Sequence, residues 1–422
     1  GVATKFTVSL ASPQNSGTAF TGTNTLTAYD AYGNVATTFN ASANAITVTS
    51  SLTGTVSGLN GSNVLNNAAD FSSGIANLTS KLTFTGTAGT GTFTFTPASG
   101  TPVTSGNVTM GSGAATRLVV TGTGTQTAGS SQTITVTAKD ASGNTVTTYT
   151  GDHAITFAGA ASSSNPVTVP TVTDKTAAAV DFATATTMTF TSGVATGSMT
   201  LYKVESPFIT ASASGISAST GGDRLSVTVS PSTGLKFTVS LATPQTSGQS
   251  FTGTNTLTAY DSWGNVATGF NAATNNITVS TTLTGTITGL TGTNKLNNVS
   301  DFTNGVSSVS GLTFTGNAGT GTFTFTTASG TAVTSSNVTI NAGTVSKLVI
   351  TGSGTQTAGV AQTITITAKD ADGNTVSGYA GDKTLTFSGA SSSVNPVTAP
   401  TVTNKNASAI NLGSNTIVTF TN

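Results

Sequence analysis

The chain has 422 residues, of which 6% are charged, with 13 basic and 13 acidic side chains. A neutral chain without a cluster of Lys or Arg offers no electrostatic surface for phosphate backbones or anionic lipids, so nucleic acid and membrane surfaces are not expected partners. The chain has no cysteine, which excludes disulfides, and no apolar run approaches the roughly 18 residues of a membrane span. Apolar residues make up 36% of the chain and alternate with Thr, which predicts an all-β fold.

A long internal repeat divides the chain. Residues 5–10 (KFTVSL) recur at 236–241, and the sequence that follows each copy is nearly identical, which gives a period of about 230 residues. A weaker repeat lies inside this unit, because residues 5–8 correspond to 117–120. We therefore predict four modules of two alternating types, which are module A1 (residues 1–114), module B1 (115–234), module A2 (235–345) and module B2 (346–422).

Alternating segments predict strands within each module. Residues 82–85 and 92–96 place aromatic or aliphatic side chains on one face and Thr on the other, so one face is expected to be buried. The corresponding inward positions of the B modules are Ile134, Val136 and Ala138 in B1, and Ile364, Ile366 and Ala368 in B2. Residues 122–131, with several Gly and Ser, are predicted to connect strands. The A modules carry a longer insert at about residues 52–77.

An Asp-x-x-Gly-Asn motif follows an alternating strand in every module. The motif begins at Asp30, Asp140, Asp261 and Asp370. Asp at the first position and Gly at the fourth predict a type I β-turn, in which the carboxylate accepts main-chain hydrogen bonds and Gly adopts a positive φ. Nine residues after each Asp stands an aromatic residue that we expect to pack near the end of its module. These aromatic residues are Phe39, Tyr149, Phe270 and Tyr379.

Residues 127–144 of module B1 carry a family resemblance. Thr127-Ala128-Gly129, the alternating strand and the turn at Asp140 resemble the bacterial immunoglobulin-like repeats of large surface proteins, and the match recurs in all four modules. The resemblance implies tandem immunoglobulin-like β-sandwich domains arranged as an extended rod, as in the stalks of invasin- and intimin-type adhesins and in many S-layer proteins. It also implies an extracellular, cell-surface location. It says nothing about the insert of the A modules.

Catalytic chemistry is not predicted, because the titratable groups are too few to converge. The chain has one histidine, His153, and one glutamate, Glu205. His153 is replaced by Lys383 in module B2, which indicates an exposed strand residue and not a base or a ligand. We therefore predict that the chain is not an enzyme, and we assign no catalytic residue.

Calcium is the one cofactor that the sequence suggests, as an alternative to a simple turn. Asp370, Asp372 and Asn374 place oxygen ligands at alternate positions, as calcium loops do, but the distal Glu of such loops is absent. The candidate ligands are Asp140 and Asn144 in B1 and Asp370, Asp372 and Asn374 in B2. Asp152 or Asp382 would add a further ligand if calcium lay between modules.

The third position of the motif differs between module types. It holds Tyr32 and Trp263 in the A modules, where the B modules have Ser142 and Asp372. Exposed aromatic residues can stack on sugar rings, but in a row of modules we favour their burial against the next domain. Tyr32 and Trp263 are therefore candidates for interdomain or ligand contacts.

Module B2 is shorter than B1. Residues 417–421 match residues 187–191, after which B1 continues through three more predicted strands, 198–204, 207–212 and 225–230. We expect the sequence to be a segment of a longer repetitive chain. The alternative is that a strand donated by a neighbouring subunit completes the last module.

The repeats predict a structural function, as the rod of a surface filament, a surface layer or an adhesin stalk. The alternative is an adhesive binding module that recognises a glycan or a partner protein through loops of the A modules, with the insert as the best location. Low charge and exposed polar strands also predict self-association into a polymer or a surface assembly.

Overall fold

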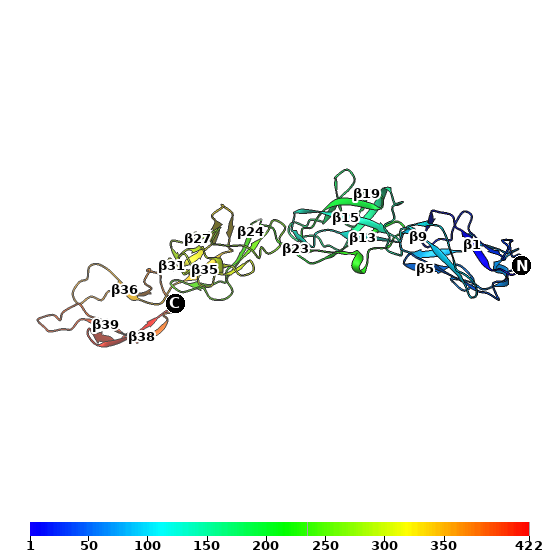
Figure 1. Cartoon of the computed structure of the whole chain (residues 1–422). Coiled ribbons are helices and arrows are strands. Elements are labelled where there is room, and N and C mark those ends of the chain that lie inside the picture. The colour runs from blue at the N-terminus through cyan, green and yellow to red at the C-terminus, as the bar shows by residue number, and fades with distance from the viewer. Residues whose placement is uncertain (234, 422) are drawn as a thin grey trace. The chain divides into compact units, whose positions relative to one another are not determined.

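The computed structural model describes residues 1–233 and 235–421, and β-strands dominate it (Figure 1). The chain divides into two compact units, Gly1–Ser232 and Thr233–Asn422, which are treated separately below. The helices among the described residues are three 3-10 turns, η1 (Ala68–Asp70), η2 (Gly221–Asp223) and η3 (Val299–Asp301). None of the described helices has the length and apolar character needed to cross a membrane.

The first unit covers the residues predicted as modules A1 and B1, up to Ser232. The module names are kept below for the predicted residue ranges. The strands of A1 are β1 (Lys5–Ser9), β2 (Gln14–Asn15), β3 (Thr25–Tyr29), β4 (Ile46–Ser50), β5 (Gly54–Ser57), β6 (Val64–Leu65), β7 (Ile75–Asn77), β8 (Thr83–Gly86), β9 (Gly89–Gly91), β10 (Phe93–Pro97), β11 (Val103–Thr104) and β12 (Val108–Gly111). The strands of B1 are β13 (Arg117–Thr121), β14 (Thr125–Thr127), β15 (Ser131–Lys139), β16 (Gly151–Ala158), β17 (Thr171–Thr173), β18 (Ala179–Asp181), β19 (Ala185–Phe190), β20 (Val194–Thr200), β21 (Phe208–Ala213), β22 (Leu225–Ser226) and β23 (Thr228–Ser230).

The second unit holds modules A2 and B2. The strands of A2 are β24 (Lys236–Ser240), β25 (Gln245–Thr246), β26 (Thr256–Tyr260), β27 (Ile277–Thr281), β28 (Gly285–Thr288), β29 (Lys295–Leu296), β30 (Val306–Ser308), β31 (Thr313–Gly316), β32 (Gly319–Gly321), β33 (Phe323–Thr327), β34 (Ala332–Thr334) and β35 (Val338–Asn341). The strands of B2 are β36 (Lys347–Thr351), β37 (Thr365–Lys369), β38 (Gly381–Thr386), β39 (Thr401–Thr403), β40 (Ala409–Asn411) and β41 (Asn415–Phe420).

Each complete module is an immunoglobulin-like sandwich whose strand pairs are antiparallel except for one short parallel pair near its start. In A1 the sheet β1-β3-β7 and the sheet β11-β10-β4-β6 contribute to one buried apolar cluster. The period-2 prediction is confirmed, because Phe84, Phe93 and Phe95 are fully buried while the Thr residues between them are not. Phe93 lies edge-on to Phe84 and to Phe20, with ring centroids 5.7 and 5.3 Å apart. Such aromatic contacts add to the hydrophobic free energy of burial.

The prediction for residues 122–131 was wrong in part. This segment contains β14, which pairs in parallel with β23, the last strand of module B1 (Thr125↔Thr228). The Gln126 side chain is buried and donates to the Met199 carbonyl at 2.9 Å, which anchors the strand. Module A1 has the same arrangement, since β2 pairs in parallel with β12. Pairing between residues about a hundred positions apart leaves no local alternation, so the pattern of Gly and Ser was misleading.

The insert of the A modules folds as additional structure of the sandwich. In A1 its strands β5, β6 and β7 pair with β8, β4 and β3, and η1 lies between β6 and β7. The insert therefore extends three sheets of the module and does not form a separate lobe.

Module B2 exposes apolar side chains that module B1 buries. In B1 strand β15 pairs with both β13 and β20. The described part of B2 ends with β41, and in it β37 pairs with β36 alone. Leu348 and Ile350 are 37% and 54% exposed, whereas their B1 counterparts Leu118 and Val120 are 0% and 2% exposed.

Candidate functional site: the junction within each module pair

The Asp-x-x-Gly-Asn motif forms the predicted turn in the described structure. In module B1 the Gly143 N–H donates to the Asp140 carbonyl at 3.1 Å, and Gly143 has φ +89°. The Asp140 carboxylate accepts the peptide N–H groups of Ser142 and Asn144, both at 2.9 Å. Asp is favoured here because its short side chain satisfies two main-chain donors of the turn.

The turns of the B modules also join each B module to the A module before it. Asp140 Oδ2 accepts the Gly113 N–H, from the segment that leads out of module A1, at 2.8 Å. The Asn144 side chain donates to the Gly86 carbonyl and accepts the Ala88 N–H, each at 2.9 Å. Gly86 is the last residue of β8, and Ala88 lies in the two-residue connection between β8 and β9. One amide side chain thus bonds to two peptide groups of the neighbouring module.

The second unit repeats this junction. Asp370 Oδ2 accepts the Gly343 N–H at 2.8 Å, and the Asn374 side chain donates to the Gly316 carbonyl at 2.9 Å and accepts the Ala318 N–H at 2.8 Å. The distances of the two junctions agree within 0.1 Å. The second junction adds a hydrogen bond of 3.2 Å between Ser247 Oγ and Asp372 Oδ2.

The junction aspartates are held in their charged form. Burial alone raises the pKa of Asp140, but hydrogen bonds from the Asn144 side chain and from the Gly113, Asn144 and Ser142 peptide groups outweigh it. The pKa of Asp140 therefore lies below its ordinary value of 3.8. The pKa of Asp370 is lowered in the same way, with burial opposed by hydrogen bonds from Asn374 and Gly343.

These contacts bear on the calcium ligands predicted from the sequence. The structure brings Asp140 together with Asn144, and Asp370 with Asn374, but the Asn amides donate N–H groups to the carboxylates at 2.8 Å. A cation would have to replace these donors, so the geometry favours the turn interpretation. In residues 1–233 and 235–421, no group of three or more His, Cys, Asp or Glu side chains is placed to hold a metal ion.

The two carboxylates suggested as extra calcium ligands have partners inside their own modules. Asp152 forms an ion pair with Lys175 and accepts the Thr189 hydroxyl. Asp382 forms the equivalent ion pair with Lys405 at 2.5 Å. Both carboxylates therefore bond within their own module, and neither is placed as a calcium ligand between two modules.

The third turn position has different surroundings in the two module types. Ser142 lies with Gly17 and Thr18 of module A1 around a concavity of about 220 Å³ at the junction. Tyr32, its A1 counterpart, is 92% exposed. Trp263, the A2 counterpart, is half-buried, and its peptide N–H donates to the Asp261 carboxylate within the turn at 2.9 Å.

The aromatic residues nine positions after each turn contact other aromatic rings of their own modules. Phe39 lies edge-on to Phe71 with ring centroids 4.6 Å apart, and Phe270 repeats this contact with Phe302. Tyr149 stacks on His153 at 3.8 Å.

The few titratable residues considered for catalysis have separate partners. The His153 ring contacts the Tyr149 ring and the Thr150 carbonyl. Glu205 accepts the Ala161 N–H at 2.7 Å and pairs with Lys203.

The fold and the junctions define the chain as a protein of tandem immunoglobulin-like sandwich modules joined in A–B pairs. No protein-family model matches the chain, and no curated protein matches it. Solved structures do align with it. Domains 4–9 of the surface layer protein SbsC share 17% identity over 83% of this chain, with a TM-score of 0.23. Invasin, a bacterial integrin-binding protein, shares 16% identity over 82% of this chain, with a TM-score of 0.32.

A third aligned structure is the Yersinia pseudotuberculosis adhesin InvE, with 19% identity over 53% of this chain and a TM-score of 0.21. The alignments span 49% of the SbsC structure, 61% of the invasin structure and 58% of the InvE structure. Surface-layer and adhesin proteins are the classes that the sequence resemblance names.

Proposed function

We propose that this chain is a structural segment of an extracellular, cell-surface protein, in which A–B pairs repeat along a rod. The observation that carries the proposal is the recurrence of the junction, since Asn374 repeats the contacts of Asn144 with the neighbouring module. Hydrogen bonds to charged or buried groups restrict the relative motion of the parts they join. A stiff pair that recurs is suited to a surface filament, a surface layer or an adhesin stalk.

The four predicted modules and their boundaries are part of this proposal. We place the junctions between adjacent modules at the Asp-x-x-Gly-Asn turns. In B1 the third turn position, Ser142, faces module A1. The equivalent residue of an A module, such as Tyr32, would then face whatever module precedes it. An exposed Tyr at that position suits burial against an apolar partner surface.

Self-association is the second part of the proposal. The chain carries little charge, so electrostatic repulsion between neighbouring copies is weak. Lateral packing of such rods would give a polymer or a surface assembly that needs no catalytic group.

Solution scattering and electron micrographs of the whole chain test the rod. The longest described strands, β15 and β16, have nine and eight residues. With their end loops they would give a module a length of about 30–40 Å, so a rod of four modules would measure roughly 120–160 Å. Particles with this length and the width of one sandwich are expected. A compact particle in which the modules fold back on one another would contradict the proposal.

A further inference from the structure

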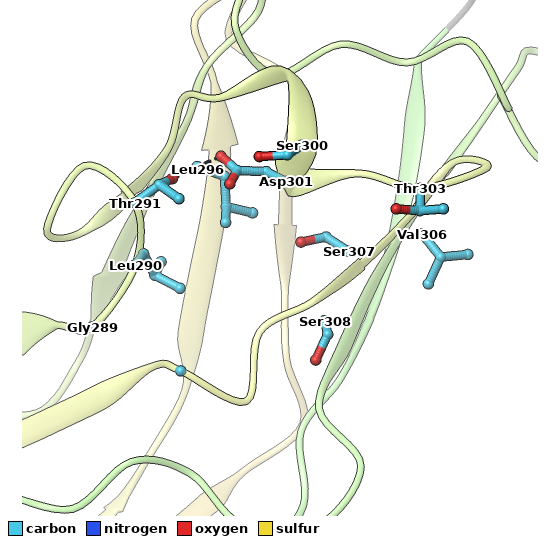
Figure 2. Close-up of a pocket in the computed structure, with 11 residues that line it drawn as sticks. Gly289, Leu290, Thr291, Leu296, Ser300, Asp301, Thr303, Val306, Ser307 and Ser308 are labelled. Carbon is cyan, nitrogen blue, oxygen red and sulfur yellow. Dashed lines mark hydrogen bonds between the residues drawn. The ribbon is translucent and has the colours of Figure 1, made fainter.

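Module A2 contains a surface pocket of about 370 Å³ that is built from its insert (Figure 2). The connection between β28 and β29, the turn η3 and strand β30 supply its walls. The residues that matter below are Leu290, Thr291, Leu296, Asp301 and Ser307. The pocket lies within one module, and none of its lining residues belongs to the junction with module B2.

The hydroxyl of Ser307 is buried without a hydrogen-bond partner. Ser307 is 1% exposed, and no group among the described residues bonds to its Oγ. In Figure 2 the Ser307 hydroxyl points toward the part of the pocket where Asp301 and Leu290 lie. A buried hydroxyl without a partner costs folding free energy, so such groups are rare, and a bound molecule that supplies the missing hydrogen bond is one explanation for them.

Module A1 avoids this cost at the same position. Its counterpart of Ser307 is Ala76, which is fully buried and pairs with Leu26 as Ser307 pairs with Leu257. The near-identical fold of A1 therefore needs no hydroxyl there. The serine of A2 is an addition that packing and strand pairing do not explain.

The nearby carboxylate also differs between the two modules. In A1 the Asn60 amide donates to Asp70 Oδ1, and the Asn67 N–H donates to Asp70 Oδ2 at 2.8 Å. In A2 both donors use the same oxygen, because Thr291 Oγ1 and the Asn298 N–H reach Asp301 Oδ2 at 2.7 and 2.8 Å. Among the described hydrogen bonds, none reaches Asp301 Oδ1. That oxygen can accept a bond from a ligand.

We propose that this pocket binds the terminal unit of a neutral saccharide. Asp301 Oδ1 accepts a hydrogen bond from one sugar hydroxyl, and Ser307 Oγ, which lies just below the pocket surface, turns outward to bond to a second. Leu290, backed by the core residue Leu296, contacts the C–H face of the ring. The lining includes a carboxylate and no Lys or Arg, so phosphate and acidic sugars are disfavoured. The volume is at the lower end of the roughly 300–1,000 Å³ of small-molecule sites, which suits one or two sugar units.

This inference goes beyond the structural function and does not depend on it. The rod is tested by the shape of the particle, whereas the pocket is tested by binding. Either can fail while the other holds.

Saturation-transfer NMR on the whole chain tests the proposal, with glucose, galactose, mannose and N-acetylglucosamine as separate probes. Transfer to the ring protons of at least one sugar is expected. Ser307→Ala should lower the affinity about fivefold and Asp301→Asn about tenfold, because each removes one hydrogen bond, the second to a charged group. Ser307→Ala is expected to fold normally, since module A1 has Ala76 there. Asp70→Asn, which changes the equivalent carboxylate of A1, is the matched control and should leave the transfer unchanged.

Three results would overturn the proposal. The first is the absence of transfer to all four sugars. The second is transfer that persists unchanged in both Ser307→Ala and Asp301→Asn. The third is calorimetric binding of calcium that both variants abolish, in a chain that binds none of the sugars. That outcome would assign the pocket to a cation.

Discussion

The side-chain oxygen of Asn144 accepts the peptide N–H of Ala88, a residue of the neighbouring module, at 2.9 Å. Asn374 and Ala318 form the same bond at 2.8 Å in the second unit. Because the donor is a main-chain group of the two-residue connection between β8 and β9, the bond holds the backbone of one module against a side chain of the other. Asn144, the last residue of the turn motif, therefore helps to determine how modules A1 and B1 are oriented relative to each other.

Asn144→Ala is expected to loosen the A1–B1 pair. The substitution removes two hydrogen bonds across the junction, each contributing about 0.5–1.5 kcal/mol, because the half-buried Gly86 carbonyl and the exposed Ala88 N–H lose their partner. The chain has no cysteine of its own, so spin labels attach only to cysteines that are introduced. Thr109→Cys places one label in module A1, and Thr147→Cys places the other in module B1. The distance distribution between the labels, measured by double electron–electron resonance, should broaden in the variant.

Asn34→Ala is the matched control for this experiment. Asn34 occupies the same turn position in module A1, and its described side-chain contacts are weak bonds of 3.4 and 3.5 Å to Asp30. The control should leave the distance distribution narrow. Equal broadening in both variants would mean that the turn, and not the contact across the junction, determines the geometry.

Acid is expected to weaken both junctions. The pKa of Asp140 and that of Asp370 are lowered in the folded protein from the ordinary value of 3.8, so their contribution is fully present above that value. It is lost as the pH falls through the lowered pKa, because protonation removes an acceptor of the Gly113 or Gly343 N–H. The label distances should therefore stay narrow from about pH 7 to about pH 4 and broaden below.

Asp140→Asn separates this effect from general acid unfolding. The introduced asparagine carries no charge and does not titrate. The distribution of label distances should therefore already be broad at neutral pH and should change little on acidification. A wild-type distribution that stays narrow to about pH 2 would show that the carboxylate charge is dispensable.

Phe93→Ala is expected to destabilise module A1 by about 3–5 kcal/mol, the usual cost of deleting a buried aromatic ring. The ring is fully buried and contacts Phe20 and Phe84. Hydrogen exchange followed by mass spectrometry should show faster exchange in A1. Module A2 keeps the equivalent Phe323 and serves as the internal control. Acceleration spread equally over A1 and A2 would contradict a module-specific core.

Gly58→Ala is expected to be far more damaging than Gly17→Ala. Both glycines have positive φ, +82° and +76°, so each substitution carries a backbone cost of about 1–2 kcal/mol. A Cβ at Gly58 would lie 1.8 Å from the Lys81 carbonyl oxygen, whereas one at Gly17 would meet nothing within 4 Å. Thermal denaturation of the two variants measures the difference. Similar melting temperatures would show that the Lys81 segment moves aside easily.

Strand faces could be predicted from the sequence, because burial of one face imposes a period of two. Phe84, Phe93 and Phe95 follow it without exception, as do Ile134 and Val136. The turn at Asp140 was also predictable, because its hydrogen bonds lie within five residues. Local patterns are sufficient for such features.

The contacts between distant segments could not be predicted in the same way. The partners of Asn144 lie 56 and 58 positions away. The motif also occurs in module A1, where the described side-chain bonds of Asn34 reach Asp30 within the same turn. Strand β14 was missed because its partner β23 is remote. Ser307 stands out only when A2 is compared with A1, where the residue is Ala76. That difference was visible in the repeat alignment, but its meaning depends on the pocket.

The parallel pairs β2–β12 and β14–β23 join a strand near the start of a module to one at its end. When the two ends are pulled apart, these strands are drawn past each other along their length. Their hydrogen bonds, which run between the strands, are then loaded together and must break together. A module fastened in this way resists stretching until a threshold force is reached, which suits a chain that carries tension.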